Sequence, residues 1–482
     1  MAPDCICAIN KLVMNQLKPL LSMTDTSVRR NGCTVFSNLT IQIQPGECWA
    51  ITGPTGSGKT TLLQTLAAQL PLSAGRVTRH QPVAFVSFRE ESRQFSYSSH
   101  FYQQRYQATM SDEGSRGQPA PTLRNFLQLT SPTDATNAEA LLNRLGLLPL
   151  LDRTLLKLSN GQTRKARIGK ALLQQPSALL LDNPFVGLDA VFRYELTQWL
   201  GQLTHDGLTL ILVTDAHDIP PFTTHVLAFD TGQNHWTGPA SLYQPEQMDT
   251  SAVPVPILQT PIQPTDFSAA FQMQDVTVRY GDTVILDKIN WSIQPGERWA
   301  LLGPNGAGKS VLLSLLYGDH PQAYANDIRI FDHRRGRGGQ SIWDVKRRIG
   351  FVSPELHLYF PQHLTTRQVI LSGLTDTLTP AKAIRPETET DLTTLLTYFG
   401  LAEHSSRAFG QLSAGQQRVV LLIRALIKNP PVLILDEPFQ ALDAEHVSLA
   451  RQLIDSLPNK TILFVTHDRN ELPTSIDRLF SL

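Results

Sequence analysis

The sequence has no net charge and no long apolar run, and both absences restrict what the protein can contact. Among 482 residues, Lys and Arg together number 42, and so do Asp and Glu. No whole-chain field therefore draws the protein to nucleic acid or anionic lipid. No uncharged apolar run of the chain reaches the roughly 20 residues needed to cross a bilayer. We therefore expect any contact with a membrane to go through a partner.

Cysteine is also scarce. The four cysteines lie within the first 48 residues, and their spacing matches neither a zinc clamp nor an iron–sulfur ligand set. The N-terminus lacks the order of basic, apolar and small residues that is typical of a secretion signal. We therefore expect the cysteines to be reduced thiols. The protein is expected in the cytoplasm, with a peripheral position on the cytoplasmic face of the inner membrane as an alternative. The first strand is expected near Leu20, after an N-terminal extension at residues 1–19, with Met14 as an alternative start.

What the sequence does contain is a glycine-rich loop that occurs twice. Each copy has the pattern G-x-x-x-x-G-K-[ST], in which backbone N–H groups surround the phosphates of a nucleotide. Each copy is followed at a similar distance by the same further motifs, which indicates a duplicated nucleotide-binding unit. The residues expected to bind ATP are Gly53, Gly56, Gly58, Lys59 and Thr60 in the first copy and Gly303, Asn305, Gly306, Gly308, Lys309 and Ser310 in the second.

The two halves align without gaps through this loop. In both, an alternating strand ends at Pro-Gly and a short apolar strand then leads into the loop. Helices are expected at Thr61–Leu70 and Val311–Tyr317, with their N-termini aimed at the phosphates. Strands that alternate with helices predict an α/β fold, a mostly parallel sheet flanked by helices in each half.

These patterns predict two domains and a linker. The expected boundaries are residues 20–238 for domain 1 and residues 267–482 for domain 2. Between them, residues 239–266 hold six prolines and few charges, which predicts an extended, semi-rigid tether.

Each half continues with a Leu-Ser-x-Gly-Gln element, at residues 158–162 and 412–416. Ser and Gly at the start of a helix offer a hydroxyl and bare N–H groups to an anion. An apolar strand with an acidic end follows, at residues 179–183 and 433–437. An aspartate there can hold a Mg²⁺ shell, and an adjacent glutamate can orient and deprotonate a water.

This ordered series resembles the ATP-binding cassette (ABC) superfamily over residues 20–230 and 267–480. In that family two cassettes pair head to tail, and each ATP lies between the phosphate loop of one cassette and the signature element of the other. The resemblance implies two helical subdomains and intramolecular pairing of the two cassettes. Ser159 and Gly161 would then face the second phosphate loop, and Ser413 and Gly415 would face the first.

The second phosphate loop has nearly every residue that the family uses for hydrolysis. The resemblance assigns ATP contact to Lys309 and Tyr280, Mg²⁺ to Ser310 and Asp436, and catalysis to Glu437, His467 and Lys309. In the family the glutamate activates water, the histidine contacts the γ-phosphate, and the aromatic residue stacks on adenine.

The first loop lacks several of these residues. It keeps Lys59 for ATP and Thr60 and Asp182 for Mg²⁺, but Asn183, Asp215 and Arg30 stand at the glutamate, histidine and adenine positions. Asparagine can orient a water but cannot take its proton, and a positioned base is worth about 10²–10⁴ in rate, or roughly 3–5 kcal/mol. We therefore expect the first site to bind ATP and to hydrolyse it far more slowly.

Two alternatives stay open at these sites. A short bulge would bring His217, rather than Asp215, to the histidine position. The family's usual glutamine is replaced by Phe88 in the first half and Pro354 in the second, where Glu90 or Glu355 are candidate substitutes.

The biological role is less constrained than the chemistry. Residues 313–322, 325–328, 341–344, 353–357 and 412–418, together with the tandem layout and short linker, resemble a branch of the family associated with molybdenum transport. An energy-supplying subunit of an importer, with a transmembrane permease as partner, is the favoured role. A ribosome-associated role and a regulatory or DNA-repair role are the alternatives, although the balanced charge does not indicate nucleic acid. Residues 89–120 are interpreted as a partly ordered loop, and residues 331–339, with Arg334, Arg335 and Arg337, as a solvated basic turn. The alternative for both is a docking surface for another protein.

Overall fold

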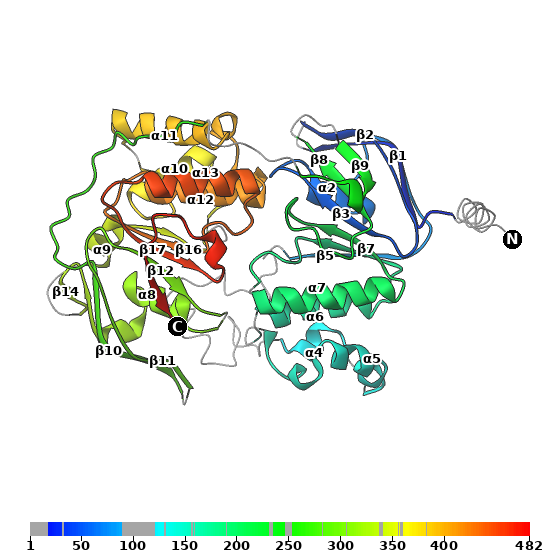
Figure 1. Cartoon of the computed structure of the whole chain (residues 1–482), viewed down its shortest axis with the longest axis horizontal. Helices are drawn as coiled ribbons and strands as arrows, with labels where there is room; N and C mark the ends of the chain where they lie inside the picture. The colour runs from blue at the N-terminus through cyan, green and yellow to red at the C-terminus, as the bar shows by residue number, and fades with distance from the viewer. Residues whose placement is uncertain are drawn as a thin grey trace.

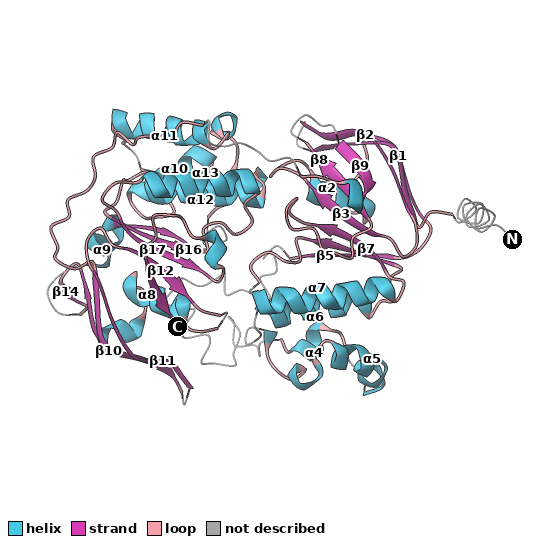
Figure 2. Cartoon of the chain, in the orientation of Figure 1, coloured by secondary structure: helices cyan, strands magenta, loops and turns pink. Residues whose placement is uncertain are grey.

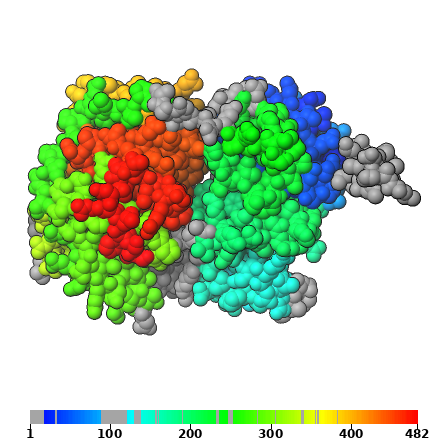
Figure 3. Space-filling model, viewed as in Figure 1, coloured from blue at the N-terminus to red at the C-terminus, as the bar shows by residue number. Residues whose placement is uncertain are grey.

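The structure is a computed structural model with two lobes, one from each half of the chain (Figure 1). It describes residues 18–482 except 31–32, 89–120, 130–131, 156–157, 159, 189, 231–234, 246–252, 282, 305, 337–340, 355, 357–359 and 382. The two lobes are in contact along the middle of the molecule, the second half in yellow-green to red and the first in blue to green (Figure 3).

The first lobe contains two sheets that share one buried helix. An antiparallel sheet has the order β2-β1-β4, from β1 (Leu21–Arg30), β2 (Cys33–Ile43) and β4 (Ala74–Arg79). The larger sheet has the order β5-β6-β7-β3-β8-β9, from β3 (Cys48–Thr52), β5 (Val83–Ser87), β6 (Ala178–Asp182), β7 (Thr209–Val213), β8 (His225–Phe229) and β9 (His235–Pro239). Its strand pairs are parallel except β8 with β9. Leu62 and Leu66 of α2 (Lys59–Leu66) are buried in one cluster with residues of both sheets.

The second lobe repeats this plan. Its antiparallel sheet has the order β11-β10-β13-β14, from β10 (Phe271–Tyr280), β11 (Thr283–Ile293), β13 (Asp327–Ile330) and β14 (His333–Arg334). Its parallel sheet has the order β15-β16-β17-β12-β18, from β12 (Arg298–Leu302), β15 (Ile349–Val352), β16 (Val432–Asp436), β17 (Thr461–Thr466) and β18 (Arg478–Ser481). The helix α8 (Lys309–Leu316) is buried between these sheets as α2 is in the first lobe.

Helices cover the other face of each parallel sheet (Figure 2). They are α6 (Asn160–Leu172) and α7 (Ala190–His205) in the first lobe, and α12 (Ala414–Leu426) and α13 (Ala444–Ser456) in the second. A further helical group packs beyond them, with α4 (Leu123–Phe126), α5 (Pro132–Arg144) and η1 (Leu148–Leu150) in the first lobe, and α10 (Thr366–Leu371), η7 (Ser372–Leu374) and α11 (Pro386–Tyr398) in the second. The remaining elements are η3 (Ala240–Leu242), η5 (Pro321–Tyr324), α9 (Ile342–Arg348), η8 (Ala402–His404), η9 (Phe409–Gln411) and η10 (Arg469–Glu471).

The predicted α/β class is confirmed, with two differences in detail. The antiparallel sheet of each lobe was not anticipated from the alternation of strands and helices. The helix expected at Thr61–Leu70 begins at Lys59 and ends at Leu66, because Ala68 adopts a φ of 61° and Pro71 follows shortly after. The helix expected at Val311–Tyr317 likewise begins two residues earlier, at Lys309.

The C-terminal part of the linker is extended and attached to the second lobe. Asp391 of α11 accepts hydrogen bonds from the backbone N–H of Gln259, at 2.7 Å, and of Thr260, at 2.8 Å. Asn429 Nδ2, just after α12, donates to Thr260 O at 2.5 Å. The linker therefore bridges the helical group and the end of α12.

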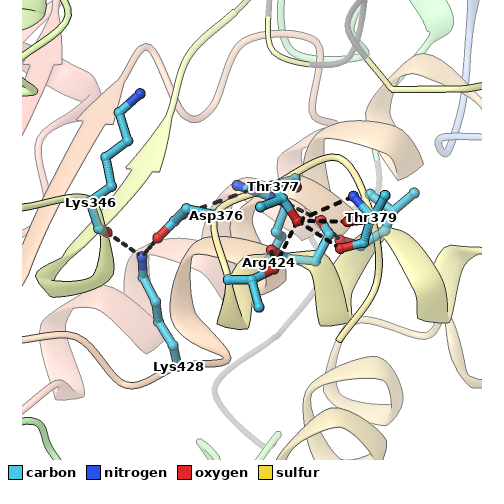
Figure 4. A network of polar contacts seen from close by, with 9 residues as sticks. Lys346, Asp376, Thr377, Thr379, Arg424 and Lys428 are labelled. Atoms are coloured by element: carbon cyan, nitrogen blue, oxygen red, sulfur yellow. Dashed lines mark hydrogen bonds and ion pairs between the residues drawn. The ribbon is translucent and has the colours of Figure 1, made fainter. Parts of the chain in front are cut away.

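A buried ion network holds the C-terminal end of α12 in place (Figure 4). Asp376 contacts Lys428 Nζ, and its Oδ1 lies 3.8 Å from Arg424 Nη2. Lys428 Nζ also donates to Lys346 O of α9 at 2.7 Å, and Arg424 Nε donates to Ser372 Oγ at 3.0 Å. Since the signature element of the second half lies at the start of α12, this network fixes the helix that carries it.

Some expectations from the sequence fall outside the described residues, and one is wrong. The segment 89–120 and Arg337 are not described. In the expected solvated turn, Arg334 is exposed as predicted, but Arg335 is only 5% exposed and lies over the Tyr324 ring, so the prediction is wrong for that side chain. Cys48 is a buried free thiol, and burial raises its pKa to about 12. Within the described residues, no helix is both long and apolar enough to cross a membrane.

Candidate functional site

Both phosphate loops join a parallel strand to the start of a buried helix. Each ends in a glycine with a left-handed backbone, Gly58 with φ 103° and Gly308 with φ 96°. A β-carbon at Gly58 would stand 2.6 Å from Val35 Cγ1, and one at Gly308 would stand 3.0 Å from Leu286 Cδ2. The left-handed backbone therefore favours glycine at both positions, and the close side chains leave little room for a β-carbon.

The loop lysines are folded over the carbonyls of their own loops. Lys59 Nζ donates to Gly53 O at 2.5 Å, and Lys309 Nζ donates to Gly303 O at 2.6 Å. Both ammonium groups thus lie where the loop N–H groups surround a phosphate. The structure brings the predicted loop residues together in each lobe, except Asn305, which is not among the described residues.

In the first lobe the aspartate at the end of β6 faces the helix start. Thr60 Oγ1 lies 3.0 Å from both carboxylate oxygens of Asp182, a side chain only 1% exposed. The neighbouring Asn183 Nδ2 donates to Asp182 Oδ1 at 3.1 Å. A carboxylate and a hydroxyl oxygen are the ligand types that Mg²⁺ prefers. This pair therefore fits the predicted metal position.

In the second lobe an acid and a histidine converge at the ends of β16 and β17. His467 Nδ1 lies 3.2 Å from Glu437 Oε1, and both side chains are about seven-eighths buried. The hydrogen bond with Glu437 raises the pKa of His467, while burial opposes it. Glu437 has a φ of 44°, and Asn183 at the same place in the first lobe has a φ of 57°. A left-handed backbone at a non-glycine residue is strained, and such strain gathers at functional sites.

The strand register places Asp215, not His217, opposite the histidine position. Asp436 pairs with Val465 in the second lobe, and Asp182 pairs with Val213 in the first. Counting two residues on from these valines reaches His467 and Asp215. The Asp215 carboxylate accepts the N–H of His217 at 2.9 Å, and His217 itself is exposed. The bulged alternative is therefore not the register that the structure adopts.

The first phosphate loop lies directly against the second half of the chain. Thr55 N donates to Asp443 Oδ2 at 2.6 Å. A β-carbon at Gly56 would stand 3.3 Å from Gln416 Nε2, and one at Gly415 would stand 2.8 Å from Thr55 Oγ1. The loop of one half thus meets the signature element of the other, with Ser413 capping α12 beside it.

Fewer of the residues expected around the second phosphate loop are described or in contact with it. Ser159 is outside the described residues, and Gly161 packs against Phe192 of its own lobe. Ser310 is exposed beside Lys309, and Asp436 is 8% exposed at the end of β16.

The adenine positions differ between the lobes. Tyr280, at the end of β10, is partly buried, and its hydroxyl lies 2.7 Å from His320 Nε2. Arg30, at the end of β1, is exposed. Glu90 and Glu355, the candidate substitutes for the missing glutamine, lie outside the described residues.

Sequence reasoning missed two arginines that brace the turns after β6 and β16. Arg164 Nη1 donates to Pro184 O at 2.7 Å, directly after Asn183. Arg418 Nη1 donates to Ser353 O at 2.9 Å, and its Nη2 donates to Gln440 Oε1 at 3.2 Å. Both arginines stand two residues after the Gln of the signature element, so comparison of the two repeats could have identified them from the sequence.

A phosphate loop after a parallel strand, beside a strand with an acidic end, defines a P-loop nucleotide-binding protein, here in two copies. The chain belongs to the ABC transporter family, whose sequence profile matches residues 36–186 and 286–440. The predicted resemblance is thereby confirmed, and the protein is an ATP-binding ATPase with tandem cassettes.

Individual relatives match nearly the whole chain. ABC transporter ATP-binding protein ModF of Escherichia coli (strain K12) is 36% identical over 90% of this chain and 91% of its own length. An uncharacterized ABC transporter ATP-binding protein of Schizosaccharomyces pombe is 31% identical over 92% of this chain and 94% of its own. Among solved structures, archaeal ribosome recycling factor aABCE1, in complex with stalk protein aP1, matches 95% of this chain and 87% of that one, with a TM-score of 0.54 at 18% identity. That likeness is one of fold.

Proposed function

We propose that this ATPase hydrolyses ATP at one of two unlike sites and supplies the energy for an importer. In this proposal residues 20–238 and 267–482 are the two cassettes, joined by residues 239–266. The observation that carries the proposal is the Glu437–His467 pair at 3.2 Å, whose counterparts in the first cassette are Asn183 and Asp215. At the position that follows the strand aspartate, the second cassette thus has a carboxylate that can take a proton from water, and the first has an amide that cannot.

At the second site, each residue has a separate task. Glu437 orients a water and accepts its proton, and the pairing with His467 fixes the direction of the carboxylate. Lys309 leaves its loop carbonyls to neutralise the β- and γ-phosphates. Ser159 and Gly161 close the site from the first cassette.

The first site binds ATP without efficient hydrolysis. Lys59 holds the phosphates, Ser413 and Gly415 close the site, and Asn183 can orient a water but cannot accept its proton. Asp182 already contacts the Thr60 hydroxyl and Asn183, which supports a polar, preformed shell. Retained ATP there would keep the cassettes paired between turnovers of the second site.

Mg²⁺ would be held by Thr60 and Asp182 at the first site and by Ser310 and Asp436 at the second. Bound there, Mg²⁺ would neutralise charge that develops on the phosphates. The fit rests on the oxygen donors of Thr60 and Asp182, which already converge at 3.0 Å.

A membrane permease is the proposed partner. An open groove of about 410 Å³ lies along the edge strand β5, beside Phe126, Arg167 and Lys170. This groove is the candidate docking surface, whereas residues 89–120, for which the sequence also suggested a docking role, lie outside the described residues. The name of the ModF relative supports a place in a transporter, which would put the chain at the cytoplasmic face of a membrane. Molybdate is the finer part of the proposal and rests on the resemblance of residues 313–322, 341–344 and 353–357.

A pull-down separates transport from the alternatives. The Glu437→Gln chain with ATP is the bait, and the same chain with ADP is the nucleotide control. Recovery of a protein with many membrane spans, lost in a Lys170→Glu variant of the groove, supports the importer. Recovery of ribosomal particles or of nucleic acid, with no membrane protein, supports a translation-associated or DNA-repair role and contradicts transport.

A further inference from the structure

The tyrosine at the adenine position of the second cassette is attached to a buried histidine. Tyr280 Oη lies 2.7 Å from His320 Nε2, and the two rings are tilted by 57° with centroids 6.1 Å apart. His320 is fully buried, at 0% exposure, in the segment that follows α8. The hydroxyl end of Tyr280 is thus fixed from inside the protein, not from solvent.

The direction of this hydrogen bond follows from the other ring nitrogen. His320 Nδ1 accepts the backbone N–H of Gln322 at 3.1 Å, so it carries no proton. In a neutral ring the proton is then on Nε2, which must donate to Tyr280 Oη. Burial lowers the pKa of His320 to about 4, so the ring is neutral at physiological pH. His320 is therefore a donor with a fixed orientation.

The segment around His320 is itself tied to the end of β10. Gln322 Nε2 donates to Arg279 O at 2.7 Å, and Gln322 Oε1 accepts from Arg279 N at 3.2 Å. Asn326 Oδ1 accepts from Thr277 N at 2.9 Å, two residues earlier in the strand. The backbone that carries Tyr280 and the ring that holds its hydroxyl thus belong to one hydrogen-bonded unit.

We propose that His320 is a positioning residue for ATP, which holds the Tyr280 ring in the orientation that stacks on adenine at the second site. This inference rests on the proposed function of that site. An unattached Tyr280 ring would lose rotamer freedom on binding, whereas a ring fixed beforehand does not. Adenine affinity, rather than the chemistry at the γ-phosphate, is what His320 would change.

The first cassette lacks both members of the pair. Counted from the first loop glycines, Gly53 and Gly303, the residue at the position of His320 is Leu70. Arg30 stands at the position of Tyr280. The pair therefore accompanies the cassette that has the catalytic glutamate and histidine, and the first site would hold its adenine less firmly.

The test is a double-mutant cycle on the full chain, read from steady-state ATPase kinetics. His320→Leu, which introduces the residue of the first cassette, and Tyr280→Phe should each raise the KM for ATP about three- to tenfold, because a hydrogen bond that orders the ring is lost. The double variant should be no worse than either single one. With CTP, whose smaller base stacks less, the KM should change less than with ATP, a difference that general loosening of the fold would not produce. Tyr324→Phe, in the same segment but with an exposed side chain, is the matched control.

The outcomes are distinguishable from failure of the proposed function. If wild-type activity depends on Glu437 but Tyr280→Phe leaves the KM for ATP unchanged, the inference is wrong and the proposed function stands. Fully additive effects in the double variant, or equal effects on ATP and CTP, also overturn it. If His320→Leu does not fold, Tyr280→Phe decides alone. If ATPase activity does not depend on Glu437, the proposed function itself is wrong, whatever the His320 variants show.

Discussion

Replacement of Glu437 by Gln is the most informative single change. In the wild-type chain His467 Nδ1 lies 3.2 Å from the Glu437 carboxylate. The amide oxygen of glutamine can still accept this hydrogen bond, but the amide cannot accept a proton from water. The left-handed backbone of this residue, with φ 44°, is retained because glutamine, like glutamate, is not branched at the β-carbon. The change therefore removes the base and little else.

The expected magnitude follows from the two unlike sites. Loss of a positioned base lowers the rate about 10²–10⁴-fold, or by roughly 3–5 kcal/mol in barrier. Because the first site has Asn183 in place of the base, it cannot supply the missing turnover. ATPase activity should thus fall to about 1% or less of the wild type, and Lys309→Ala should have a similar effect.

The assay is phosphate release by the purified chain at saturating ATP. Asn183→Gln is the matched control, since it lengthens an amide at the equivalent position of the first cassette, and it should change the rate by less than about twofold. Equilibrium dialysis with ATP confirms that both variants still bind nucleotide. Equal losses from Glu437→Gln and Asn183→Gln would refute the asymmetry.

Three further predictions test the parts that support these sites. Asp443→Ala removes the acceptor of the Thr55 N–H, at 2.6 Å, and should shorten the time for which the first site retains ATP. The retention time is measured by a chase of labelled nucleotide. An unchanged retention time would show that this contact does not hold the cassettes together. Asp391→Ala leaves the N–H groups of Gln259 and Thr260 without their buried acceptor and should lower the free energy of unfolding of the second cassette by about 2–4 kcal/mol in urea, whereas a loss below about 0.5 kcal/mol would mean that the linker is not part of its fold. The pKa of His320 is lowered from 6.5 to about 4 by burial, so the unfolded chain binds the extra proton between these values and stability should fall as pH drops through that window. With each pKa unit worth about 1.4 kcal/mol, His320→Leu should be less sensitive to acid than the wild type in thermal unfolding, and identical pH profiles would contradict a buried neutral ring.

Local patterns in the sequence predicted the phosphate loops and the acidic strand ends better than the contacts around them. The glycine pattern fixes the loop at Gly53–Thr60 because only a residue without a side chain fits its backbone, and the acidic strand ends at Asp182 and Asp436 follow from the parallel sheet. Those features depend on neighbours in sequence, and the structure has them where they were expected.

Individual side-chain contacts between distant segments could not be predicted from local patterns, and only the family resemblance placed the signature element against the first phosphate loop. Tyr280 and His320 are 40 residues apart, and Thr55 and Asp443 are 388 apart, so no periodicity marks them as partners. In the antiparallel sheets, the sequence pattern of each strand does not indicate which other strand it pairs with. The early end of α2 at Leu66 goes with a left-handed residue, Ala68, for which alanine gives no sequence signal, so Pro71 alone did not fix the last residue of the helix.

The central claim is that one chain binds two ATP molecules and hydrolyses only the one at the second site. It is tested most directly by loading the wild-type chain with labelled ATP and Mg²⁺ at both sites, adding an excess of unlabelled ATP, and following the bound label over time. The account predicts that half of the bound label becomes ADP rapidly while the other half remains ATP for many turnovers. Conversion of both halves at the same rate would contradict it.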